Sequence, residues 1–310
     1  MPYGVKVRVL SAAQELDFGK LMQDNIPTES VDDKKSIVQI VIHSFFVIPF
    51  ILSIFAVMVF LMIRILTSEP NTARDFLEDV KIGGATKRWQ GAFELSKLLS
   101  NPKMVPKDDS FINEMISTFE YYDKDKDDRI RQYLALAMGA TKDKRYVSTL
   151  MEALKSSNAG VVQASAFALG TIKSEQAVES LIILLKSNDP QSRLHSVMAL
   201  GKIGTKSTNG PLRSMLRDPE PNVRWDTAIA LAKQKDLSSR TILLDLLDRE
   251  YLNSFTNLDE KERAQILLVA IQVSHFVGNN EIKIVLEKLK KDDSNLKIRE
   301  AARVGLEKFE

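Results

Sequence analysis

The chain has 310 residues, of which 44% are apolar, so it is long enough for one elongated domain or two ordinary domains with a sizeable core. Its 43 Lys and Arg residues nearly balance its 41 Asp and Glu residues, which excludes a strong overall attraction to nucleic acid or to acidic substrates. It contains no cysteine, and this excludes disulfides, thiolate metal sites and a cysteine nucleophile.

A long apolar run follows an N-terminal tail (1–35) of mixed charge, in which only 11–22 has the pattern of a short helix. From Ser36 to Ile63 the chain carries no charged residue. A helix needs about 20 apolar residues to cross the roughly 30 Å hydrocarbon core of a bilayer. We therefore predict a transmembrane helix over 36–66. The alternative is a buried helix of a soluble core, but that helix would show a polar stripe, and the second half of this run shows none.

Details of the run bear on its type. A cleaved signal peptide is disfavoured, because the run starts deep in the chain and no small-residue cleavage site follows it. We expect His43, which like Gln39 lies in the first half, to sit at the membrane interface. Pro49 is expected to kink the helix, since it removes one backbone hydrogen bond. Lys and Arg are evenly divided between the two flanks, so the positive-inside rule leaves the orientation open.

Internal repeats dominate the rest of the chain. In four segments, apolar residues recur at i, i+3, i+4 and i+7, as in a helix with one buried face. A second apolar helical segment precedes three of the four, so each unit is predicted to be a pair of antiparallel helices. Asp189 and Pro190 predict a helix start, as N-cap and first residue. The four segments are 127–140, 158–171, 189–202 and 220–233, in which Arg131, Val162, Arg193 and Arg224 are spaced by 31 residues.

Looser copies extend the array on both sides. The segments 87–99 and 296–309 fit the pattern, whereas 261–273 is helical but out of register. Irregular terminal units are expected, because end repeats must cap the stack. Small residues recur inside the second helices and predict close approach between neighbouring units. They are Ala137, Ala168, Ala199 and Ala230, with Ala135, Ala166 and Ala228.

The second-helix pattern, V-R-x-x-A-x-x-A-L-G in outline, resembles the short HEAT-like repeat also found in phycobilisome-lyase subunits. The apolar run followed by 68–99 is similar to bacterial membrane-anchored HEAT-repeat proteins. The resemblance covers about 85–310, most strongly 127–233. It implies an all-α fold, a HEAT-like α-solenoid of antiparallel helix pairs preceded by one transmembrane helix, with 67–84 as a juxtamembrane helix or linker. It also implies a location in the inner (cytoplasmic) membrane, with the repeats on the cytoplasmic side.

One motif invites a metal site. Asp123, Asp125 and Asp127 have the first three ligand spacings of a calcium loop. The turn glycine is replaced by Asp128, and the final bidentate glutamate by Leu134. We therefore interpret this segment as a turn between helices.

Other catalytic or metal-binding patterns are missing from the sequence. The three histidines, His43, His195 and His275, lack metal-ligand spacing, and no His-Glu pair occurs, which disfavours the di-iron hydroxylase type of HEAT scaffold. No nucleophile elbow is present, and Gly83–Gly84 is interpreted as a break between helices 72–82 and 86–99. We expect no catalytic residue, no cofactor and no metal, and hence no enzyme.

Recurrent residues of the second helices are the candidates for partner binding. The repeated arginines either bind phosphate or form a ladder to an acidic or carbonyl group of a neighbouring unit, and the ladder is favoured. Trp89 and Trp225 share one repeat position, and the residues four positions later continue a stripe. This stripe either forms an apolar groove for a partner or is buried between units. The candidate partner-binding residues are Trp89, Phe93, Phe167, Arg193, Met198, Arg224 and Trp225.

The leading functional hypothesis is a membrane-tethered scaffold or adaptor that binds a protein partner through its repeat surface, within a transporter or another envelope assembly. A lyase-like accessory enzyme on a HEAT scaffold is the alternative. Nucleic-acid binding is disfavoured by the near-zero net charge and by the apolar run, and no small-molecule substrate is evident.

Overall fold

The computed structural model describes residues 43–66, 72–122 and 127–309. Two compact units divide the chain, 1–69 and 70–310. The predicted tail, its helix over 11–22 and Gln39 lie outside the described residues. All regular structure within the described ranges is helical.

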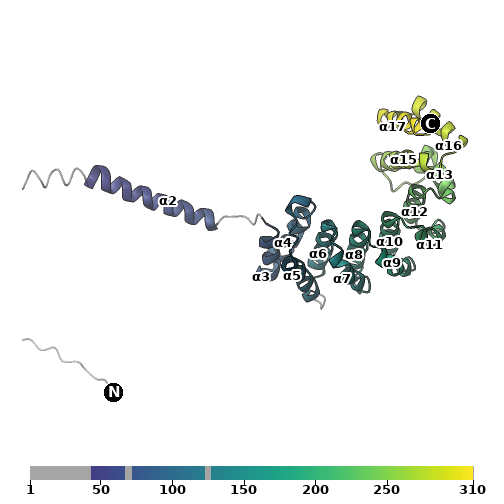
Figure 1. The fold of residues 1–310 in the computed structure, drawn as a ribbon. Coiled ribbons are helices and arrows are strands. Elements are labelled where there is room, and N and C mark those ends of the chain that lie inside the picture. Colours follow the sequence, from purple (N-terminus) through teal and green to yellow (C-terminus); the bar gives the residue numbers. More distant parts are fainter. Residues whose placement is uncertain (1–42, 67–71, 123–126, 310) are drawn as a thin grey trace, which may run out of the picture. The chain divides into compact units, whose positions relative to one another are not determined.

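The described part of the first unit is one continuous helical rod (Figure 1). It begins as a π-helix, His43–Val47, and continues as α2, Ile48–Leu66. The change from π to α geometry occurs next to Pro49, which has no N–H to give to the helix ladder. Within the described residues, Phe45–Ile65 is the one helix long and apolar enough to cross a membrane, and no part of it is buried.

Antiparallel helix pairs build the second unit. The first helices of the pairs are α3 (Ala73–Ile82), α5 (Asp109–Tyr121), α7 (Val147–Ala153), α9 (Val178–Leu184), α11 (Asn209–Met215), α13 (Arg240–Leu247) and α16 (Asn280–Asp292). The second helices are α4 (Ala85–Leu98), α6 (Asp128–Thr141), α8 (Ala159–Ile172), α10 (Pro190–Ile203), α12 (Pro221–Lys233), α15 (Glu260–Ser274) and α17 (Leu296–Glu307). One short extra helix, α14 (Arg249–Asn253), lies between α13 and α15.

Single 3-10 turns join many of these helices. Those at Lys144–Tyr146, Glu175–Ala177, Lys206–Thr208 and Leu237–Ser239 lead directly into α7, α9, α11 and α13. Two more lie at Pro102–Met104 and His275–Val277. The first four follow the 31-residue repeat, so the turn geometry repeats along with the helices, although the residues differ.

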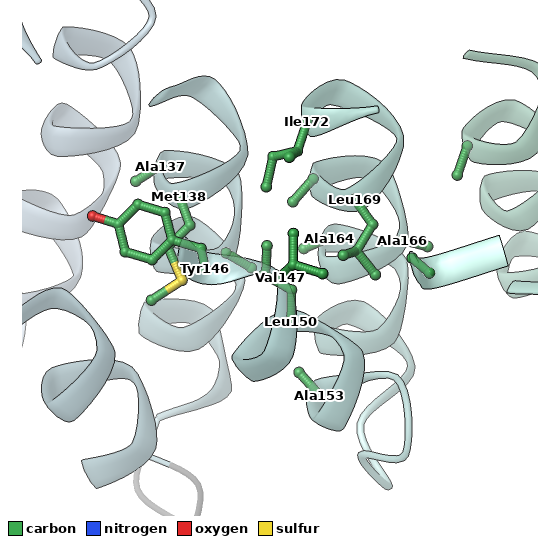
Figure 2. Close-up of a cluster of buried hydrophobic side chains, with 14 of the residues drawn as sticks. Ala137, Met138, Tyr146, Val147, Leu150, Ala153, Ala164, Ala166, Leu169 and Ile172 are labelled. Atoms are coloured by element: carbon green, nitrogen blue, oxygen red, sulfur yellow. The ribbon is translucent and has the colours of Figure 1, made fainter. Parts of the chain in front are cut away.

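The second helices stack side by side along the inner side of an arc within this unit, and the first helices form its outer row (Figure 1). Apolar side chains fill the space between the two rows. Figure 2 shows Val147 and Leu150 of α7 pointing toward Leu169 of α8, with Met138 of α6 beside Tyr146. This is the packing that the apolar positions of the repeat predict, because one helix pair cannot bury its apolar face alone.

Glycine sets the spacing between neighbouring second helices. A Cβ on Gly139 would lie 2.6 Å from the Cα of Ala168, and one on Gly170 would lie 2.6 Å from the Cα of Ala199. At Gly201 it would lie 2.7 Å from the Cβ of Ala230. The predicted close approach through Ala168, Ala199 and Ala230 is therefore confirmed, and glycine supplies its other side.

Helix starts follow the predicted caps. Asp189 accepts a hydrogen bond from the backbone N–H of Ser192, and Pro190 is the first helical residue. At the equivalent positions, Asp127 and Asn158 also cap their helices with the side chain, whereas Glu220 does not. Carboxylates and amides satisfy the free N–H groups of a first turn.

One feature differs from the sequence interpretation, and one predicted irregularity is explained. α3 buries Leu77 and Val80 in the same core as α4, so the first helix pair begins at Ala73 rather than at 85. The irregular register of 261–273 results from α14 and the loop after it, which are inserted between α13 and α15.

Of the calcium-like motif, residues 123–126 lie outside the described residues, and Asp127 caps α6 and pairs with Arg129 at 2.9 Å.

Candidate partner-binding surface

A row of apolar side chains crosses the second helices at one repeat position. Phe93 of α4 is 37% exposed, and the other members are partly exposed. Because they recur on neighbouring helices of the inner row, they lie in one row along it, which we call the inner stripe. It comprises Phe93, Leu136, Phe167, Met198 and Ile229.

The N-terminal end of the inner stripe is aromatic. The ring of Phe93 meets that of Tyr133 edge to face at 5.3 Å. The guanidinium of Arg129 lies 5.8 Å from the ring of Trp89, which is half-buried. Of the predicted residues, Trp89 and Phe93 therefore lie near one another and reach the surface. An offset or edge-to-face arrangement leaves part of each ring face free for another apolar group.

Lysines border the inner stripe one helical turn further on. The ammonium of Lys97 lies 5.2 Å from the ring of Phe93, and that of Lys202 lies 3.8 Å from the ring of Phe167. Lys233 holds the equivalent position on α12 and is exposed. Lys97 pairs with Glu94 at 3.0 Å. Within the described residues, Lys202 and Lys233 form no ion pair.

The charges around Lys202 are poorly balanced. Burial lowers the pKa of Lys202, and the nearby Lys233 lowers it further. Across the stripe, burial raises the pKa of Asp226, although Lys233 and His195 act in the opposite direction. The Nδ1 atom of His195 lies 2.8 Å from the carbonyl oxygen of Gln191, within its own helix. A carboxylate placed next to Lys202 would therefore relieve an unfavourable desolvated charge.

The repeated arginines have structural partners. Arg193 is buried, and its Nε and Nη2 atoms each donate to the carboxylate of Asp218 at 2.8 Å. Its Nη1 atom donates to the carbonyl of Ser187, and Arg224 donates in the same way to the carbonyl of Asp218 at 2.7 Å. Arg88, which directly precedes Trp89 and so shares the repeat position, donates to the carbonyl of Gly83 at 2.6 Å. Arg193 therefore forms the predicted link to a neighbouring unit, whereas Arg224 and Arg88 bind carbonyls in the turn that precedes their own helix.

Trp225 also occupies an interior site. It is 4% exposed, and its ring meets that of Phe255 at 4.9 Å and that of Tyr251 at 6.4 Å. Its Nε1–H donates to the hydroxyl of Tyr251 at 3.2 Å. Both partners come from the inserted segment around α14, which lies outside the repeat pattern. Of the two alternatives for the aromatic stripe, Trp225 therefore has the buried one.

Sequence reasoning missed several residues of this surface. Tyr133 follows Arg131 by two positions and contacts Phe93, and Lys97, Lys202 and Lys233 each follow a stripe residue by four positions. Lys202 and Lys233 are 31 residues apart, and this repeat spacing could have identified them from the sequence. Seven predicted residues thus divide into two sets. Phe93, Trp89, Phe167 and Met198 reach the inner surface, whereas Arg193 and Trp225 are buried and Arg224 is bound to the backbone.

Comparison with known proteins supports this architecture. Residues 118–189 and 178–253 match the family of HEAT repeats. A search of curated proteins finds no match. The complex of CpcE and CpcF of phycocyanin lyase from Nostoc sp. PCC7120 is similar in structure, with a TM-score of 0.52, 17% identity, and coverage of 79% of this chain and 97% of that one.

Two further solved structures are more distant. The Escherichia coli protein YibA has a TM-score of 0.49 and 19% identity, and covers 78% of this chain and 83% of its own. A designed armadillo repeat protein in complex with the peptide (KR)4 has a TM-score of 0.40 and 14% identity, and covers 78% of this chain and all of its own. Together, the matched repeats and the observed helix pairs establish the chain as a HEAT-like protein whose second unit is an α-solenoid.

Proposed function

We propose that this protein is a membrane-tethered scaffold that binds a protein partner through the inner stripe and acts without catalysis of its own. The partner segment would place apolar anchors on Phe93, Phe167 and Met198, and carboxylates against Lys202 and Lys233. An amphipathic helix or an extended acidic segment has both features. A transporter or another envelope assembly is the proposed setting.

One observation carries the partner part of this proposal. The inner stripe stays partly exposed, although the same repeat builds well-packed interfaces on either side of it. Contiguous apolar surface rimmed by polar groups is typical of interaction sites. Lys202 adds a preference for acidic partners, because it is partly desolvated and has no ion pair within the described residues.

The membrane part rests on the helix Phe45–Ile65 and on the resemblance to membrane-anchored HEAT-repeat proteins. We propose a single pass through the inner membrane with the repeats on the cytoplasmic side. Alkaline extraction of membranes should leave the full chain in the pellet. Protease added to right-side-out vesicles should then spare the repeats, and protease added to inverted vesicles should degrade them. Release by alkali, or the reverse protection pattern, contradicts this part.

Site-specific photocrosslinking tests the partner surface. Benzoylphenylalanine would replace Phe93 or Phe167 in the full chain, in its own membranes. Each position should give a discrete adduct, because an anchor seated on the stripe lies against these rings. The adduct from position 167 should fall several-fold in a Lys202→Glu chain, since the charge reversal repels an acidic partner.

Ile183 provides the matched control. It is apolar, 71% exposed, and lies on α9 in the outer row. Equal crosslinking from positions 183 and 167 would mean that the inner stripe is not the contact surface. Thermal melting of each variant, followed by circular dichroism, separates a lost contact from a lost fold.

A further inference from the structure

The most unusual backbone positions of the solenoid are three lysines. Within the described residues, Lys142, Lys173 and Lys235 are the only residues other than glycine with positive φ, at 59°, 58° and 59°. Gly204 holds the equivalent place on α10, with φ at 70°. These four residues are spaced by 31, and each follows the end of a second helix.

Local structure explains the conformation but not the residue type. A left-handed residue after a helix lets the following N–H groups bond to the last free carbonyls, as Lys173 and Ser174 do with Gly170 and Leu169. Glycine adopts this conformation without a Cβ clash, and asparagine is the usual second choice. Lysine interacts favourably with the helix dipole, which offsets part of the strain. Three strained lysines in one register nonetheless indicate a use for their charge.

These lysines lie on one edge of the solenoid with other cations. Equivalent positions of successive second helices lie side by side, as Gly139 and Gly170 do with Ala168 and Ala199, so their C-terminal ends share an edge. Lys144 and Lys206, in the 3-10 turns that follow, are exposed on it. We call this set the basic edge: Lys142, Lys144, Lys173, Lys206 and Lys235.

The basic edge has little internal compensation. Within the described residues, none of its five lysines forms an ion pair. Two of its acidic residues are already engaged, Asp143 with Arg145 and Asp236 with Arg213 at 2.7 Å, and Glu175, in register with Lys144 and Lys206, remains as an exposed carboxylate. The opposite edge carries both signs, since its turns hold Asp127, Asp189 and Asp218 together with Lys155, Lys186 and Arg217. The near-zero net charge of the chain thus conceals one edge with a row of unpaired lysines and another edge of mixed charge.

We propose that the basic edge binds the anionic headgroups of a lipid bilayer. Two observations favour a bilayer over other polyanions. The lysines stand in a row with one or two per repeat, which suits a planar array of single charges, and the same chain carries a candidate membrane span, Phe45–Ile65. From Leu66 to Ala73 the chain has seven residue steps, which reach at most about 25 Å. The tether alone therefore keeps the repeats near a bilayer, and the edge would fix how they face it.

This inference rests on the membrane part of the proposed function, but not on the inner stripe. Each lysine close to an anionic leaflet contributes roughly a five-fold gain in binding, which is lost beyond a Debye length or in high salt. An edge of several lysines would therefore hold the solenoid against anionic lipid and release it from neutral lipid.

The absence of cysteine permits a direct test in the full chain. A single cysteine replaces Ser207 on the basic edge or Ser157 on the opposite edge, both exposed, and carries a fluorophore. The labelled chain is reconstituted in bilayers of phosphatidylcholine, with or without phosphatidylglycerol, that contain a headgroup quencher. With phosphatidylglycerol, position 207 should be quenched far more than position 157, and high salt should remove the difference.

Asparagine gives matched variants. Lys142→Asn, Lys173→Asn and Lys235→Asn together keep residues that tolerate positive φ and remove three charges. The apparent affinity of the edge for anionic lipid should then fall on the order of 100-fold, and the quenching difference between positions 207 and 157 should shrink with it. The melting temperature should be unchanged or higher. Gly204→Asn, at the same turn of α10, should leave the quenching unchanged.

Three results would overturn the proposal. The first is equal quenching at both positions in anionic bilayers, and the second is no effect of the triple variant. The third is loss of quenching when duplex DNA is added at a phosphate concentration far below that of the lipid, because this would reassign the edge to nucleic acid. A chain that fails to insert contradicts the tether instead. In that case, salt-sensitive co-sedimentation with the same anionic vesicles still supports the edge, and its absence refutes it.

Discussion

At the scale of single residues, equivalent repeat positions differ in how far their side chains are buried. Trp89 and Trp225 share one position, yet Trp89 reaches the surface and Trp225 is buried under Tyr251 and Phe255. The ion pairs show the same individuality. Arg193 and Asp218 are both buried, whereas Asp236 is buried and its partner Arg213 is 57% exposed. A repeat position therefore fixes a direction on the helix, and the neighbouring residues fix the environment.

Asp236 should make stability sensitive to acid. Burial raises its pKa, but hydrogen bonds from Arg213 and Ser238 outweigh burial and hold the pKa at about 2, below its ordinary value of 3.8. Because the folded-state pKa is depressed, the stabilisation is complete above about pH 4 and is lost as the pH falls through about 2. Asp236→Asn should cost about 1–2 kcal/mol at neutral pH and flatten the acid limb of unfolding.

Urea unfolding at a series of pH values, followed by circular dichroism, measures this effect. Asp292→Asn is the control, since Asp292 is exposed at the end of α16. If the two variants had parallel pH profiles, the contacts of Asp236 would not contribute to acid stability.

At the scale of elements, the solenoid depends on how closely the second helices approach. Gly139, Gly170 and Gly201 each face an alanine of the next second helix with no room for a Cβ. Glycine is unfavourable inside an isolated helix by about 1 kcal/mol relative to alanine. Its presence at three equivalent positions is explained by packing between helices, which outweighs the local preference.

Gly170→Ala should therefore destabilise the protein. The new methyl group would lie 2.6 Å from the Cα of Ala199, and a backbone shift is needed to accept it. The expected loss is about 1–3 kcal/mol, despite the better helix propensity of alanine. Gly210→Ala is the matched control, because nothing lies within 4 Å of its Cβ position in α11. The control should be neutral or stabilising by up to about 1 kcal/mol.

Thermal and urea unfolding of the two variants compare the effects. A Gly170→Ala protein as stable as the Gly210→Ala protein would show that the second helices separate easily and that their spacing is not fixed by glycine.

At the scale of the whole molecule, the solenoid has two apolar cores that meet at α12. Val223 and Leu231 of this helix belong to the N-terminal core, and Trp225 and Ala232 to the C-terminal one. In repeat proteins, stability is approximately a sum of terms between neighbours. A defect on one side of α12 should therefore remain largely on that side.

Trp225→Ala tests this division. Removal of the indole from its buried contacts should cost about 3–5 kcal/mol. Hydrogen exchange should accelerate in α13, α15 and α17 and change much less in α6 and α8. Phe93→Ala, at an exposed ring, should change stability by less than about 1 kcal/mol and serves as the control. Uniform acceleration along the unit would indicate one cooperative core instead of two.

Much of the fold was predictable because it depends on local patterns. Apolar periodicity and the 31-residue interval predicted the helix pairs and their stacking, and Asp189 with Pro190 predicted a helix start; the structure confirms these. The pairing of α3 with α4 was not predicted, because the first pair departs from the regular repeat. The transmembrane assignment of 36–66 stays a prediction.

The sequence by itself determined that this chain forms a HEAT-like solenoid, since a period of 31 with one apolar face per helix leaves stacking as the way to bury that face. Only the tertiary structure decided which equivalent residues are available to a partner. Trp225 is covered by an inserted segment that lies outside the repeat pattern, and Arg193 is paired with Asp218, 25 positions away. Exposure is a property of neighbours in space, so only the packed helices show which members of the predicted stripe reach the surface.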